Sequence, residues 1–148
     1  MPSIIPGYVY TLFAALIVGA IIVCGCSLAS LNVRNEAVNQ QLSNIDQYVA
    51  AQSLTLITRT VQDNQNTTMQ LDLPSQVGNQ IYWVCLANCS LGAEVLGGLG
   101  TTVVVGSQPG VSIPAQVAAN GVYSSDFGRA FLQCCVVNET VTLTLMSD

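Results

Sequence analysis

The fold is decided by one apolar stretch near the start of the sequence, Tyr8–Leu31, which reads YVYTLFAALIVGAIIVCGCSLASL. It contains no charged residue, and the first charged side chain of the whole sequence is Arg34. As a helix, these roughly 24 residues would extend about 36 Å. The hydrocarbon core of a bilayer is about 30 Å thick. The stretch is therefore predicted to span a membrane, or to be buried among equally apolar neighbours.

Small residues recur at helical spacing inside this stretch. Ala15 and Gly19 are four positions apart, and so are Gly25 and Ala29. Small residues at this spacing allow two helices to approach closely. Glycine and alanine are also common in any membrane helix, so the pattern alone leaves both interpretations open.

The helix is predicted to continue well beyond the apolar stretch. No proline or glycine lies between Ser27 and Gln70, so we expect one helix from about Pro6 to about Gln62, about 80 Å long. Its second half has an apolar stripe at helical spacing, formed by Val38, Leu42, Ile45 and Val49 and then, displaced by about one residue, by Leu54, Ile57 and Val61. A stripe of this kind predicts packing against a head domain or against copies of the same helix.

The rest of the chain predicts a small β domain. We expect a helical domain over 1–62, a polar linker over 63–68 and a β-rich head over 69–148. Short segments rich in β-formers, separated by glycine and proline, are typical of an antiparallel sandwich or barrel, and they are Met69–Leu73, Ile81–Leu86, Thr101–Val105, Val111–Ile113, Phe131–Val137 and Val141–Met146. Gly97–Gly100 is interpreted as a turn. The predicted fold class is α+β.

Charge is scarce throughout the sequence. Only 7% of the 148 residues are charged, against about a quarter in an ordinary soluble domain, and the net charge is −5. There is no histidine and no lysine, so no basic patch could neutralise the phosphates of a nucleic acid. Without histidine the commonest general base and metal ligand is also missing, and the eight acidic residues are scattered. We therefore expect neither an enzyme nor a cofactor.

Cysteines fall into two groups. Cys24 and Cys26 lie in the apolar stretch, where a free cysteine behaves as a small apolar residue. The other four are even in number and lie in the predicted head, which in an exported domain indicates one or two disulfides. The disulfide candidates are Cys85, Cys89, Cys134 and Cys135. A zinc site with four thiolates is the alternative, although adjacent cysteines on a strand point to opposite faces.

Three acceptor sequons for N-linked glycans follow the predicted helix. They begin at Asn66, Asn88 and Asn138. Their common position after the helix favours an outward-facing, glycosylated head.

These features together resemble the type IV pilin superfamily, and archaeal pilins and archaellins in particular. The segment Pro2–Leu12, PSIIPGYVYTL, resembles the residues just after the leader-peptide cleavage site of archaeal pilin-like proteins. The segment Leu73–Trp83, LPSQVGNQIYW, resembles a head-domain motif of the same group. The glutamate that bacterial pilins carry at their fifth mature position is Ile5 here, as is common in archaeal members.

The resemblance implies a subunit of an extracellular, pilus-like filament for adhesion or surface attachment. Its precursor would wait in the cytoplasmic membrane, lose a leader to a leader peptidase and polymerise at an assembly platform. The apolar helix would then form the filament core with copies of itself, through positions such as Tyr8, Leu12, Ala15, Leu16, Gly19, Ile22, Val23 and Ala29. The alternative is a single-copy, membrane-anchored outer domain, such as an archaellum stator-like or binding module.

Overall fold

A computed structural model describes residues 4–90, 92–104, 110–137 and 140–147, without side chains for 4–6 and 137. One helix, α1 (Ile4–Asp63), is followed by seven strands. This agrees with the predicted helix and confirms the α+β fold class. By residue contacts the chain divides into two compact units, 1–37 and 38–148. The second half of α1 therefore belongs to the same unit as the strands.

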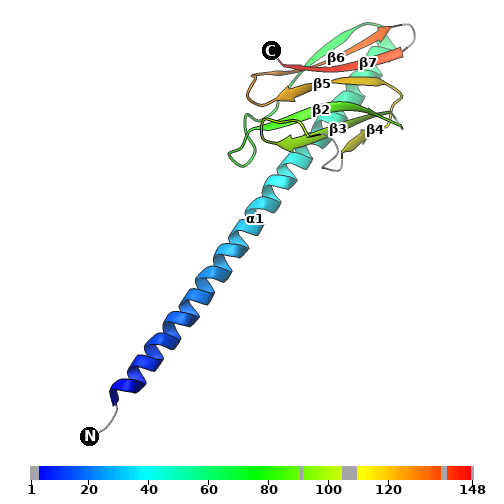
Figure 1. Cartoon of the computed structure of the whole chain (residues 1–148). Coiled ribbons are helices and arrows are strands. Elements are labelled where there is room, and N and C mark those ends of the chain that lie inside the picture. Colours follow the sequence, from blue (N-terminus) through cyan, green and yellow to red (C-terminus); the bar gives the residue numbers. More distant parts are fainter. Residues whose placement is uncertain (1–3, 91, 105–109, 138–139, 148) are drawn as a thin grey trace. The chain divides into compact units, whose positions relative to one another are not determined.

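The strands form one seven-stranded sheet (Figure 1). Their order across the sheet is β1-β6-β7-β5-β2-β3-β4, and every neighbouring pair is antiparallel except β5 and β7. Their bounds are β1 (Thr67–Leu71), β2 (Tyr82–Cys89), β3 (Gly92–Leu99), β4 (Val111–Ile113), β5 (Ala118–Ser124), β6 (Ala130–Val137) and β7 (Thr140–Ser147).

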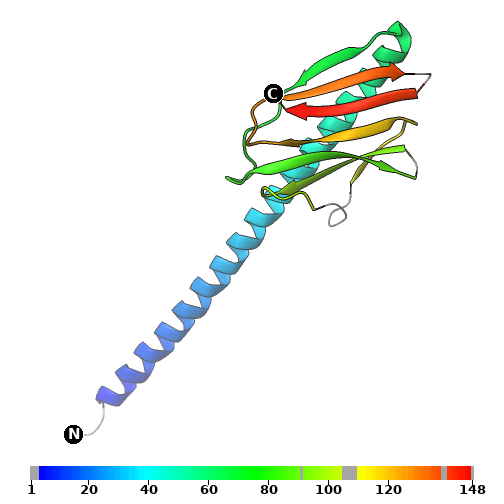
Figure 2. The same ribbon diagram turned by 45° about the horizontal axis from the view of Figure 1, so that its top comes forward.

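The second layer of the head is helical. The order of the strands is linear, with β1 and β4 at its two ends, so the sheet is not closed into a barrel. Residues 38–63 of α1 lie across one face of the sheet (Figure 2). The predicted sandwich or barrel is therefore wrong. Alternating strands show that one face of a sheet is apolar, but they do not show whether a second sheet or a helix covers that face.

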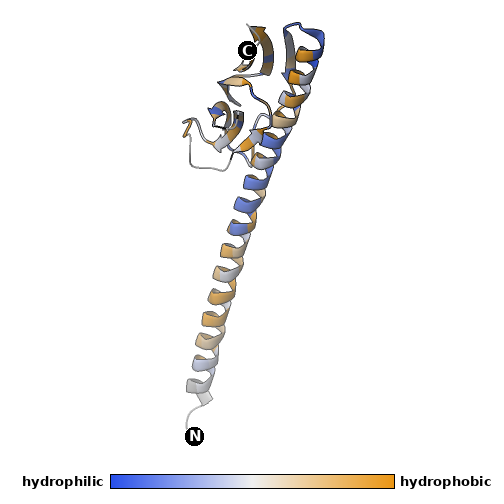
Figure 3. Cartoon of the chain, turned by 90° about the vertical axis from the view of Figure 1, so that its right-hand side faces the viewer, coloured by the Kyte–Doolittle hydropathy of each residue, from blue (hydrophilic) through white to orange (hydrophobic). Residues whose placement is uncertain are grey.

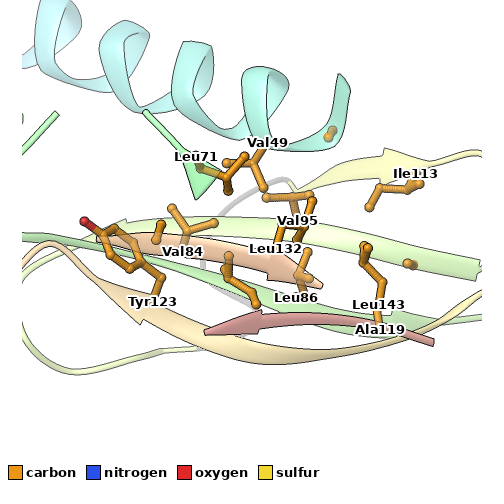
Figure 4. Close-up of a cluster of buried hydrophobic side chains, with 14 of the residues drawn as sticks. Val49, Leu71, Val84, Leu86, Val95, Ile113, Ala119, Tyr123, Leu132 and Leu143 are labelled. Carbon is orange, nitrogen blue, oxygen red and sulfur yellow. The ribbon is translucent and has the colours of Figure 1, made fainter. Parts of the chain in front are cut away.

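The hydrophobic core lies between α1 and the sheet. From the helix, Leu42, Val49 and Leu56 repeat every seven residues and are almost fully buried. They meet the inward side chains of the strands, several of which are seen in Figure 4, including Leu71, Val84, Val95, Leu132 and Leu143. Burial of each large aliphatic side chain stabilises the unit by about 1.5–3 kcal/mol.

One part of the predicted helical stripe is wrong. Leu54 and Val61 are 40% and 56% exposed, whereas Leu56 and Thr60 are buried. The buried positions continue at the same helical spacing from Leu42, without the predicted displacement of one residue. The sequence pattern missed this because polar Ser53 and Thr60 occupy buried positions of the stripe.

The glycine-rich segment 97–100 is also different from its prediction. Gly97 and Gly98 lie inside β3, and only Gly100, with φ of +96°, is at the bend that follows it. Residues 101–104 form no strand, while β3 and β5 were not foreseen. The glycines serve close packing, because a Cβ on Gly97 would collide with the carboxylate of Asp46 and one on Gly98 with the indole of Trp83.

The segment that resembles a pilin head motif forms a tight corner at the start of β2. Val77 and Gln80 exchange two backbone hydrogen bonds of 3.0 Å around Gly78 and Asn79, whose φ values are +56° and +71°. Positive φ at both central residues makes this a type I′ turn. Gly78 packs directly against Val38 of α1, where a larger side chain would not fit.

The C-terminal end of α1 is clearly defined. The helix ends at Asp63, and Asn64 adopts a left-handed φ of +48°, a common way to terminate a helix. β1 begins at Thr67, within the segment that was predicted as linker.

Candidate functional site: the exposed apolar helix

The first unit of the chain presents an apolar surface that is exposed in the described part of the single chain. All side chains from Gly7 to Ala37 are exposed in the described structure. Among the predicted core positions, Tyr8 is 73% exposed and Val23 is 65% exposed, and the same holds for Leu12, Leu16 and Ile22 at 58–61%. Soluble proteins rarely leave a continuous apolar surface of this size in water. This helix is also long and apolar enough to cross a membrane.

The small residues of this segment leave room beside the helix. A Cβ added to Gly19 or Gly25 would meet nothing within 4 Å, and Ala15 and Ala29 are exposed. Within the described chain, the space beside these small residues is therefore not filled by any other residue.

Two hydroxyl groups in the apolar segment satisfy their hydrogen bonds within the helix. Thr11 donates to the carbonyl of Tyr8 at 2.9 Å, and Ser27 donates to the carbonyl of Val23 at 2.8 Å. A hydroxyl that is bonded in this way needs no partner from water. The segment can therefore lie in lipid or among other helices without the cost of these unpaired polar groups.

Polarity changes sharply after the apolar segment. Figure 3 shows apolar turns followed by several polar turns along the helix. Arg34 and Glu36, the first two charged residues, lie in this polar band and are exposed. The apolar surface thus has a clear end close to residue 33.

The predicted disulfides are not present. All six cysteines are free thiols. Cys85 lies on β2 and Cys134 on β6, with β5 and β7 between them, so three strand spacings of about 4.8 Å separate the two strands. A disulfide needs Cα atoms within about 7 Å of each other. Cys134 belongs to the core beneath α1, whereas Cys85 packs with Trp83 and Leu96 in a separate cluster.

The same separation removes the four-thiolate alternative. Within the described residues, no group of three or more cysteine or acidic side chains is placed to hold a metal ion. Burial raises the pKa of both the Cys85 and the Cys134 thiol. These two cysteines are therefore small core residues in their thiol form.

Two of the three sequon asparagines can be placed. Asn88 is exposed, and its Oδ1 accepts a hydrogen bond from the backbone N–H of Ala119 at 2.6 Å. Asn66 is exposed too, and its Oδ1 accepts from the N–H of Val136 at 3.4 Å. Both contacts use the oxygen, so the amide nitrogen that a glycan would modify is not the atom engaged. Asn138 lies outside the described residues.

One notable residue gave no signal in the sequence. Asp46 of α1 is only 5% exposed and faces Gly97 of β3. Burial raises its pKa from 3.8 to about 7, against the lowering effect of a hydrogen bond from the Gly97 backbone. An aspartate between apolar positions of a helix usually marks the solvent side, so only its spacing from Leu42 and Val49 could have suggested burial.

Comparisons with known protein families, with curated proteins and with solved structures found no match. The function must therefore be argued from the chain itself.

Proposed function

We propose that this protein is the structural subunit of an archaeal type IV pilus-like extracellular filament, for adhesion or attachment to surfaces. Each chain would contribute its segment 8–31 to a core of packed helices, and its sheet to the outer layer. The partners would be copies of the same chain, with N-linked glycans on the head. The precursor would lie in the cytoplasmic membrane before a leader peptidase and an assembly platform act on it.

The observation that carries this proposal is the continuity of α1. The exposed apolar segment passes into the half of the helix that packs against the sheet, without a break between Ile4 and Asp63. A head that is merely tethered to a membrane needs only a flexible connection. An uninterrupted helix instead leads from the apolar surface into the head with no linker between Ile4 and Asp63, as we expect for the subunit of a regular polymer.

Physical chemistry supports the use of one segment in two surroundings. Apolar side chains gain little by moving from lipid to a protein core of similar polarity, so packing and close approach must supply the preference for assembly. Exposed small residues such as Gly19 provide that approach. A charge in the segment would be costly in either setting.

A single-copy membrane anchor is the second candidate, and the length of the apolar segment favours it equally. Electron microscopy of sheared cell-surface material separates the two. Helical filaments that contain this chain support the first proposal. Recovery of the chain only as monomers from detergent-extracted membranes would support the second and overturn the first.

A further inference from the structure

A buried carboxylate lies where α1 first becomes enclosed by the head. Asp46 is one turn beyond Leu42 and is 5% exposed. It is one of three buried polar residues of α1, together with Ser53 and Thr60. Ser53 bonds to the helix itself, through the Val49 carbonyl at 2.7 Å. Asp46 is the only one of the three that can carry a charge.

The surroundings of Asp46 do not compensate a negative charge. Its Oδ1 atom has no hydrogen-bond partner in the described structure. The backbone N–H of Gly97 on β3 is the one donor that lowers the pKa of this carboxyl, and no basic side chain contributes. The titratable group that faces it from β2 is Tyr82, whose own pKa is raised by burial and then by the charges of Tyr123 and Asp46. An ionised carboxylate that is buried without a partner is strongly unfavourable.

The contact between helix and sheet is tight at this point. Any side chain on Gly97 would collide with the Asp46 carboxylate, so there is no space for a neutralising group from β3. About two turns earlier, Val38 is held by Gly78 of the type I′ turn. The docked part of α1 therefore begins at the helical turns between these two contacts.

We propose that Asp46 is a proton-operated latch between α1 and the sheet. When it carries a proton, the helical turns from Val38 to Ala50 dock on the head, with Asp46 against Gly97 of β3 and Val38 against Gly78. When the proton passes to water, the carboxylate is more stable outside the interface, and these turns detach locally while the rest of the core stays closed. This inference concerns the head unit alone and does not depend on filament assembly.

The latch would set how much of α1 is free of the head. With the turns docked, the helix is fixed to the sheet from Val38 onward. With the turns released, the docked part of α1 would begin near Ser53. Acid conditions would therefore favour the docked state of these turns and alkaline conditions the released state.

Hydrogen–deuterium exchange of the full chain in neutral detergent micelles tests this proposal. Rates would be measured between pH 5 and pH 8 and corrected for intrinsic exchange. A carboxyl whose pKa falls from about 7 when docked to 3.8 when open predicts that local opening rises roughly a hundredfold across this range. The increase should be confined to residues 42–50 and to β3, with β6 and β7 as internal references.

Asp46→Asn keeps the shape of the side chain but cannot ionise. It should remove the pH dependence and keep residues 42–50 protected at pH 8. Asp72→Asn, at an exposed position, is the matched control and should behave as the wild type. Equal protection of the wild type at pH 5 and pH 8, or the same loss in Asp46→Asn, would overturn the latch.

A direct titration keeps the test decisive if Asp46→Asn folds poorly. Carbon-13 labelling of aspartate carboxyl groups in the unaltered chain gives the ionisation of each by NMR. The latch requires one aspartate, assigned to Asp46 through its backbone connectivity in the unaltered chain, to titrate near pH 7. A chain in which every aspartate titrates near pH 4 would contradict it.

Discussion

The two halves of α1 differ in polarity and in the burial of their apolar side chains. Residues 7–37 are apolar for most of their length and are exposed on every side, whereas residues 38–63 are mixed in polarity and bury one stripe against the sheet. The apolar side chains of the second half are buried against the strands of the same chain. The first half makes no such contacts in the described structure, and it is the part that we propose packs against lipid and then against copies of the chain. The difference places the packing of the head in the second half of α1 and leaves the first half for the assembly that we propose.

The largest expected effect is a charge placed in the first half. Ile17→Asp should abolish filament assembly. Ile17 is 59% exposed in the single chain, and a carboxylate there would have to be desolvated in the proposed filament core. Negative-stain microscopy and sedimentation of surface fractions measure the loss. Thr101→Asp, which adds the same charge on the exposed surface of the head, should leave filaments intact. Normal filaments from Ile17→Asp would contradict the division between the halves.

The next effect tests stability instead of assembly. Leu56→Ala removes a side chain that is 1% exposed and should lower the free energy of unfolding of the head by about 2–5 kcal/mol. Leu16→Ala makes the same chemical change at a 61% exposed site and should leave that free energy unchanged. Chemical denaturation of both variants in detergent, followed by the fluorescence of Trp83, provides the comparison. Similar losses in the two variants would mean that the first half also stabilises the head.

The pH dependence of stability sharpens the comparison at Asp46. The pKa of this carboxyl is about 7 in the folded state and 3.8 as a free side chain, so the folded state binds its proton more tightly. Its contribution is therefore most favourable at low pH and declines as the pH rises from about 4 to about 7. Between pH 5 and pH 8 the free energy of unfolding should fall by about 2–3 kcal/mol.

Thermal and denaturant unfolding at several pH values would measure this decline, and Asp46→Asn should flatten it. Stability that rises from pH 5 to pH 8 in the wild type, with no difference in Asp46→Asn, would show that Asp46 is not buried in its acid form.

The smallest expected effect comes from the closest approach of helix and sheet. Gly97→Ala places a methyl group against the Asp46 carboxylate and should cost about 1–3 kcal/mol of stability. Asp46→Ala combined with Gly97→Ala should recover part of that loss, because the two side chains compete for one space. A double-mutant cycle measures the coupling. Additive effects would mean that the two positions do not touch. Neither change should affect the first half of the helix.

Much of this arrangement could be predicted from the sequence. The length of α1 follows from the absence of proline and glycine between Ser27 and Gln70, and the exposed apolar segment follows from its lack of charge. Strand β6 was predicted to within one residue, because Phe131–Val137 is rich in β-formers between polar boundaries. These are local properties of the chain.

The errors arose where tertiary contacts override local preference. Gly97 and Gly98 look like a turn, but they lie in a strand paired with β2, and they are glycines because Asp46 and Trp83 occupy the space that side chains would need. The cysteine pairing failed because strand order cannot be deduced from strand positions, and β5 and β7 come between Cys85 and Cys134. Asp46 was missed because its spacing from Leu42 and Val49 was the only sign of burial, and burial of an acid depends on which face of the helix the sheet covers.

The central claim is that segment 8–31 packs against copies of itself. Helical reconstruction of filaments by electron cryomicroscopy tests it most directly, by measuring the contacts of this segment in the assembled state. We predict a core of parallel helices in which Leu16, Gly19 and Val23 are buried against neighbouring chains, with the sheets outside. Filaments held together only by their heads, or preparations that contain only monomers in membrane, would contradict the claim.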